Sequence, residues 1–117
     1  MIEENLKKTV EEFSEIVKCI ESLEILEEEH ISRLKAKLNL FDGTNLWIRE
    51  MAVRGKLEIY SYYWLRPDGS VIIGWDNAPH HKELNHYPHH KHIGHKVETS
   101  QEREVREVLE FIKKFLG

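Results

Sequence analysis

Apolar residues near the N-terminus recur at intervals of three and four positions. This spacing places them on one face of an α-helix, which turns once every 3.6 residues. We therefore predict a helix over residues 2–23, with helical composition that continues to about residue 29. The positions that define the apolar face are Ile2, Leu6, Val10, Phe13, Val17 and Ile20.

After this segment the apolar period changes to two, which is typical of a half-buried β-strand. Residues 34–40 alternate in this way, and similar runs cover residues 46–53, 57–65 and 71–75. Glycine-containing turns separate the runs, and glycine readily adopts the positive φ that such turns need. Four strands joined by short turns predict an antiparallel meander. The turns are Asp42-Gly43, Arg54-Gly55 and Pro67-Asp68-Gly69.

Residues 76–96 show no period and are interrupted by Pro79, Pro88 and Gly94. An irregular segment of this length is uncommon in a small domain and is usually functional or disordered. Helical spacing returns after it, and Thr99 with Glu102 matches a capping box at a helix N-terminus. The apolar positions of this closing helix are Val105, Val108, Leu109, Ile112, Phe115 and Leu116.

The order of elements predicts an α+β fold: an N-terminal helix, a four-stranded antiparallel sheet, a histidine-rich loop and a C-terminal helix. Packing both helices on one face of the sheet is the simplest arrangement. A chain of 117 residues buries one modest core, so we predict a single domain over residues 1–117.

The net charge of −4 hides an asymmetry along the chain. Residues 1–29 contain ten acids and three lysines, a balance of −7, whereas the remainder has a balance of +3. The overall acidity therefore does not argue against a nucleic-acid substrate, because the acid is concentrated at one end.

The location of the protein follows from what the sequence lacks. It has no basic start followed by an apolar stretch, as a signal peptide has, and no apolar run of membrane-spanning length. Its one cysteine, Cys19, cannot form an internal disulfide. We expect a cytoplasmic protein that does not contact a membrane.

Seven of the eight histidines lie between residues 80 and 95. Imidazole titrates near neutral pH, so two histidines can abstract and donate protons in one reaction on a phosphodiester. Cations would stabilise the charge of the transition state, and aromatic rings would stack on bases. The catalytic candidates are His80, His81, His89, His90, His92 and Asp76, and the substrate-binding candidates are Lys91, Lys82, Arg66, Tyr62, Trp75 and Tyr87.

Two other interpretations of the histidines compete with this one. His90 and His92 would face the same side of an extended segment and could bind a metal ion with Asp76 or His80. However, the segment has none of the standard ligand spacings, and we predict neither a metal nor another cofactor. Some of the histidines would also simply cap turns. Asp76 either orients a histidine or begins the turn through its side chain, and the sequence favours neither role.

Two motifs in this segment resemble those of the TumE family, small prokaryotic toxins of type II toxin–antitoxin pairs. They are residues 75–81, Trp-Asp-Asn-Ala-Pro-His-His, and residues 87–92, Tyr-Pro-His-His-Lys-His. The resemblance implies a toxin that a cognate antitoxin neutralises. Many such toxins are ribonucleases with a small sheet and flanking helices, similar in layout to the RelE-like fold, which is an analogy at the level of the fold.

We therefore predict a toxin that acts as a metal-independent ribonuclease on RNA and is compatible with a homodimer. The alternative is a non-enzymatic module that binds a nucleotide or a metal within a two-protein complex. A toxin that transfers nucleotides is a third hypothesis. The absence of a Gly-Ser element with paired acids weakens it.

Overall fold

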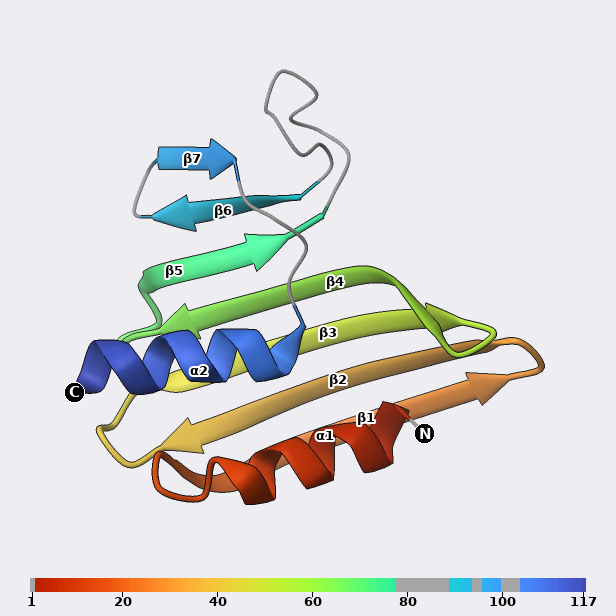
Figure 1. The fold of residues 1–117 in the computed structure, drawn as a ribbon, viewed down its shortest axis with the longest axis horizontal. Helices are drawn as coiled ribbons and strands as arrows, with labels where there is room; N and C mark the ends of the chain where they lie inside the picture. The colour runs from red at the N-terminus through yellow and green to blue at the C-terminus, as the bar shows by residue number, and fades with distance from the viewer. Residues whose placement is uncertain (1, 78–88, 94–95, 100–103) are drawn as a thin grey trace.

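The computed structural model describes residues 2–77, 89–93, 96–99 and 104–117. The described residues form two helices and an antiparallel sheet of seven strands, which lie in the sheet in their order along the chain (Figure 1). This confirms the α+β class and the order of helix, sheet and helix. The prediction of four strands is wrong, because one strand precedes the predicted four and two follow them. The elements are α1 (Ile2–Glu12), β1 (Val17–Glu28), β2 (Ile31–Leu40), β3 (Asn45–Val53), β4 (Lys56–Leu65), β5 (Val71–Asp76), β6 (His90–Ile93), β7 (Lys96–Thr99) and α2 (Val105–Leu116).

The first extra strand, β1, replaces the second half of the predicted N-terminal helix. Its pairing with β2 shifts at two irregularities, each of which inserts one residue into β1. Apolar residues of β1 therefore lie three positions apart while their partners on β2 lie two apart. A spacing of three resembles a helical period, and this explains the error. The pairs are Val17 with Leu40, Ile20 with Leu38, and Leu23 with Ala36.

The second and third extra strands, β6 and β7, form within the segment that has no apolar period. Three residues of β6 pair with the end of β5, and β7 pairs with β6. Backbone hydrogen bonds with a neighbouring strand need no particular side chains, so the sequence pattern did not reveal this hairpin.

Both helices lie on the same face of the sheet (Figure 1). The buried residues of α2 are Val105, Val108, Leu109 and Ile112, as the helical spacing predicted, whereas Phe115 is 65% exposed. The helix does not begin at the predicted capping box. Thr99 ends β7, and the backbone N–H of Glu104 donates instead to the Glu107 carboxylate at 3.1 Å. No helix among the described residues is long and apolar enough to cross a membrane.

The sheet therefore has two different faces. The helix-covered face carries the core, which includes Leu38, Ile48, Tyr62 and Trp64. One ion pair joins the two helices, Arg106 with Glu12, and a second joins α2 to the turn after α1, Lys113 with Glu15. The opposite face, which neither described helix covers, is called the open face below. Side chains alternate between the two faces along each strand.

Candidate active site

Three polar side chains meet at the open face where β5 ends. The carboxylate of Asp76 accepts a hydrogen bond from the Tyr63 hydroxyl at 2.8 Å, and the same oxygen lies 3.0 Å from Nε2 of His92. The rings of Tyr63 and His92 stack with their centroids 5.7 Å apart. Neighbouring strands β4, β5 and β6 each supply one of these residues, which together are called the Asp76 cluster.

Gly74 makes this arrangement sterically feasible. It pairs with Tyr63 on one side and with His92 on the other. A Cβ atom at position 74 would lie 2.4 Å from Cε2 of the Tyr63 ring, far closer than carbon atoms approach. The absence of a side chain therefore lets the Tyr63 ring lie over β5 and reach Asp76.

The protonation of the cluster follows from its surroundings. Burial, together with the hydrogen bond to Asp76, raises the pKa of Tyr63 above its usual value, so this hydroxyl remains a donor at neutral pH. Only 9% of the Asp76 side chain and 20% of the His92 side chain are exposed. In the tautomer in which Nε2 of His92 donates to the Asp76 carboxylate, proton exchange with a bound molecule takes place at Nδ1.

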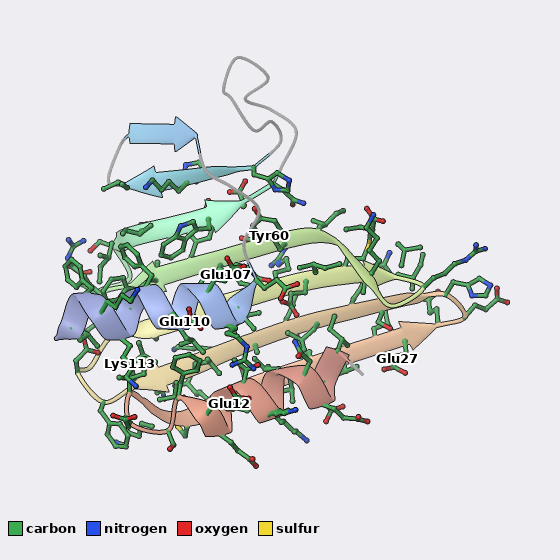
Figure 2. All side chains as sticks on the ribbon, viewed as in Figure 1. Glu12, Glu27, Tyr60, Glu107, Glu110 and Lys113 are labelled. Carbon is green, nitrogen blue, oxygen red and sulfur yellow. The ribbon has the colours of Figure 1, made fainter. Side chains whose placement is uncertain are left out.

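A second polar group lies on the helix-covered face. The Tyr62 hydroxyl donates to Oε2 of Glu50 at 2.5 Å, and the Tyr60 hydroxyl lies 2.9 Å from Nδ1 of His89. Figure 2 shows Tyr60 on the face of β4 that carries α2. Glu50 is only 6% exposed, and burial raises the pKa of its carboxyl group.

A cavity of about 550 Å³ adjoins Glu50 on the same face. It is lined in part by the charged side chains of Glu50, Arg54 and Glu104, and His30 also borders it. Its size is in the range of small-molecule sites, about 300–1,000 Å³. The structure therefore offers two candidate sites, one on each face of the sheet.

A model of the family described as Toxin TumE matches residues 7–117, which is nearly the whole chain. The chain belongs to the TumE toxin family. Comparisons with curated proteins and with solved structures find no match. Family membership identifies a toxin.

In this TumE family member the histidines predicted to act together are divided between the faces. His92 belongs to the Asp76 cluster on the open face, whereas His89 contacts Tyr60 on the other. His90 pairs with Asp76 in the register of β5 and β6. Other predicted site residues lie outside the described residues, namely His80, His81, Lys82 and Tyr87.

Burial contradicts the stacking role predicted for Tyr62 and Trp75. Tyr62 is 0% and Trp75 2% exposed, and the Trp75 ring packs edge-on against Phe111 of α2. Neither ring is available to a base, because alternation along the strands turns both toward the core.

The structure does not bring the described cationic candidates to the Asp76 cluster. Arg66 donates to the carbonyl of Val71, at the end of β5 opposite to Asp76. Lys91 pairs with Trp75, and because side chains alternate along β6, it faces the side away from His92.

Sequence reasoning missed Tyr63 and Glu50 as site residues. Tyr63 was one of several residues on a predicted strand face, and its role depends on its pairing with Gly74. Glu50 did leave a signal, because it is a lone acid that alternates with apolar Leu46, Ile48 and Ala52. A charged residue on the buried face of a strand is uncommon and indicates a specific role.

The described residues contain no group of three or more His, Cys, Asp or Glu side chains that could hold a metal ion. Among the residues that the structure describes, the Asp76 cluster brings together one histidine and one carboxylate. The hydroxyl of the half-buried Tyr63 is its third member. This composition suits proton transfer by an oriented imidazole.

Proposed function

We propose that this chain is the toxin of a type II toxin–antitoxin pair and that it cleaves RNA by histidine acid–base chemistry. Membership of the TumE family supports the toxin role and implies an antitoxin partner. The contact between Asp76 and His92 on the open face supports the chemistry, because a carboxylate that orients an imidazole is a recurrent arrangement for proton transfer.

His92 acts as the general base in this proposal. Its Nδ1 takes the proton of a ribose 2′-hydroxyl, and the resulting oxygen attacks the adjacent phosphorus. The bond from phosphorus to the 5′-oxygen then breaks and leaves a 2′,3′-cyclic phosphate. The negative charge of Asp76, 3.0 Å from Nε2, stabilises the imidazolium that forms. The reaction needs no metal ion, since the protons move between the RNA and side chains.

The departing 5′-oxygen needs a proton from a second group. We assign this role to His90, because it pairs directly with Asp76 in the register. His80 and His81 are the alternatives that the sequence offers. His89 receives no role in this step, since it contacts Tyr60 on the other face of the sheet.

The test is cleavage of a fluorescent single-stranded RNA in the presence of a metal chelator. His92→Ala should lower the rate by about a hundredfold or more, the usual contribution of a general base. Asp76→Asn should lower it by about tenfold or more, because the imidazole then loses its charged partner. His90→Ala should resemble His92→Ala, and each variant should also lose toxicity in cells.

The matched control is His30→Ala, which removes a histidine that borders the other candidate site. This variant should cleave RNA at the wild-type rate. Circular dichroism would establish that all variants are folded. Full cleavage by folded His92→Ala would overturn the proposal, and so would cleavage that the chelator abolishes.

The cavity beside Glu50 favours a second candidate function, a module that binds a nucleotide without cleaving RNA. Arg54 supplies a cation for a phosphate, and the buried carboxyl group of Glu50 supplies a hydrogen-bonding group for a base or sugar. A panel of nucleotides would then raise the melting temperature of the wild-type protein, and Arg54→Gln would remove the effect. Such stabilisation without RNA cleavage would favour this candidate over the ribonuclease.

A further inference from the structure

Two rows of side chains cross the open face and end at the Asp76 cluster. In the first row each residue is the direct partner of the next on the neighbouring strand. The second row lies beside the first, and its residues are likewise direct partners on neighbouring strands. The first row is Lys37, Trp47, Tyr63, Gly74 and His92, and the second is Lys35, Arg49, Ser61 and Asp76.

The first row presents aromatic rings next to cations. Trp47 is 47% exposed, although tryptophan is usually among the more buried residues. Nζ of Lys37 lies 5.3 Å from the centroid of its ring. Tyr63, the partner of Trp47 on β4, is half-buried, and its ring stacks on His92. Exposed rings beside cations are the usual platform on which nucleic-acid bases stack.

The second row adds the positive charges of Lys35 and Arg49, and Glu24 of β1 is the register partner of Lys35. Lys35 and Arg49 form no ion pair with a described residue. Lys37, in contrast, is paired with Glu21 at 2.8 Å, so acid is present where the open face meets β1. Positive charge is thus concentrated on β2 and β3 of a protein whose net charge is −4.

The surface between these rows is hollowed. A cleft of about 330 Å³ is lined by Lys35, Trp47, Arg49 and Tyr63, together with the smaller Ser61. Glu24 of β1 also lines this cleft. The cleft therefore brings both cations of the second row and both rings of the first to one concave surface.

We propose that the open face binds single-stranded RNA across β2 to β6 and leads it to His92. Bases stack on Trp47 and Tyr63, and phosphates contact Lys35 and Arg49. Strands lie about 4.8 Å apart, so the track from Lys37 to His92 spans roughly 19 Å. Sheets that bind RNA in this way stack two or three bases. The inference deepens the proposed ribonuclease function and rests on it for the role of His92.

A duplex does not fit this surface, because its paired bases are not available for stacking on Trp47. The charge pattern alone would also suit an acidic segment of the antitoxin. The exposed rings favour RNA over such a segment, since stacking requires a flat partner.

The test is fluorescence anisotropy with 2′-O-methylated single-stranded RNA, which lacks the 2′-hydroxyl and is not cleaved by the wild-type protein. Trp47→Ala should raise Kd by about tenfold or more, the usual contribution of one stacked base. Lys35→Ala and Arg49→Ala should each weaken binding. Each should also reduce the slope of log K against log salt concentration by about 0.7, the value for one lost phosphate contact on a single strand.

The matched control is Lys114→Ala, which removes a cation from the exposed side of α2. It should leave Kd and the salt slope unchanged. The inference is overturned if Trp47→Ala and Arg49→Ala bind the RNA as tightly as the wild type. It is also overturned if these variants no longer bind the antitoxin but still bind the RNA.

The same variants separate this inference from the proposed catalysis. Cleavage that depends on His92 but not on Trp47 or Arg49 would remove the track and leave the catalytic proposal standing. RNA binding that depends on Trp47 and Arg49, without cleavage by any form of the protein, would support the track and overturn the catalytic proposal.

Discussion

At the scale of single residues, the Asp76 cluster depends on the absence of a Cβ atom at Gly74. The Tyr63 ring occupies the space that a Cβ at position 74 would need, and its hydroxyl reaches Asp76 from there. The residue that makes the site feasible thus contributes no functional group of its own. Its role is to allow a close approach between β4 and β5 side chains.

Gly74→Ala tests this steric role. The added methyl group should displace the Tyr63 ring, lower stability by about 1–3 kcal/mol as overpacking does, and weaken RNA cleavage because Asp76 loses a donor. Denaturant unfolding and the cleavage assay measure the two effects. In a Tyr63→Ala background the same substitution should be nearly neutral for stability. Equal costs in both backgrounds would contradict the role assigned to Gly74.

Glu50 shows a different effect of burial on a single side chain. Its raised pKa means that the folded protein holds the proton more tightly than the unfolded chain does. The stability that this carboxyl group contributes is therefore present below its ordinary pKa of 4.5 and is lost as pH rises through the folded value.

Glu50→Gln should remove this pH dependence, since glutamine does not titrate but can still accept the hydrogen bond from Tyr62. The stability advantage of the variant over the wild type should grow between acidic and neutral pH. Denaturant unfolding at several pH values measures the difference. Glu11→Gln, at an exposed position of α1, serves as a comparison for the loss of one carboxylate. A constant difference across pH would contradict the raised pKa of Glu50.

At the scale of elements, the register between strands decides more than the propensity of any one segment. The double irregularity of β1 lets residues spaced by three face the core, which a helix would also achieve.

Asn77, the residue after β5, pairs with β4 through its side chain. Its side chain accepts from the backbone N–H of Tyr60 at 3.0 Å and donates to the carbonyl of Glu58 at 2.8 Å. This side chain therefore extends the pairing of β5 with β4 beyond the last strand residue.

Asn77→Ala should loosen the end of β4 without disturbing the centre of the sheet. The loss of both side-chain hydrogen bonds should cost about 1–3 kcal/mol in total. Hydrogen exchange should become faster at the Tyr60 amide, while amides of β2 and β3 remain protected. An unchanged exchange rate at Tyr60 would show that the side chain of Asn77 is dispensable there.

At the scale of the whole molecule, the sheet separates two chemically different faces. The helix-covered face carries the core, Glu50 and the larger cavity, whereas the open face carries the Asp76 cluster and the proposed RNA track. Substitutions on the open face should therefore affect activity more than stability. Substitutions at Tyr62 or Glu50 should affect stability more than activity.

The whole chain should unfold as one cooperative unit, as expected for a single domain of 117 residues. Buried Trp64 and Trp75 belong to the same core cluster as residues of α1 and α2. Intrinsic fluorescence and far-ultraviolet circular dichroism should therefore give one midpoint. The unfolding enthalpy should be about 80 kcal/mol near 60 °C, from roughly 0.7 kcal/mol per residue. Two separate transitions would contradict a single domain.

The sequence by itself determined the elements whose apolar residues repeat regularly. Alternation in β2–β5 and helical spacing in α2 each place one face toward a core, and local periodicity reports that directly. The concentration of histidines also indicated a candidate site in the segment that contains β6. The sequence pattern failed where the period was misleading, as in β1, or where backbone pairing alone made the strand, as in β6 and β7.

Only the tertiary structure decided which side chains meet. His89 and His92 are three positions apart in the sequence but contact residues on opposite faces of the sheet. Tyr63, Gly74 and His92 are distant in the sequence but adjacent across three strands. The physical reason is that strand register sets contacts between distant residues, and a shift of one residue would turn every side chain to the other face.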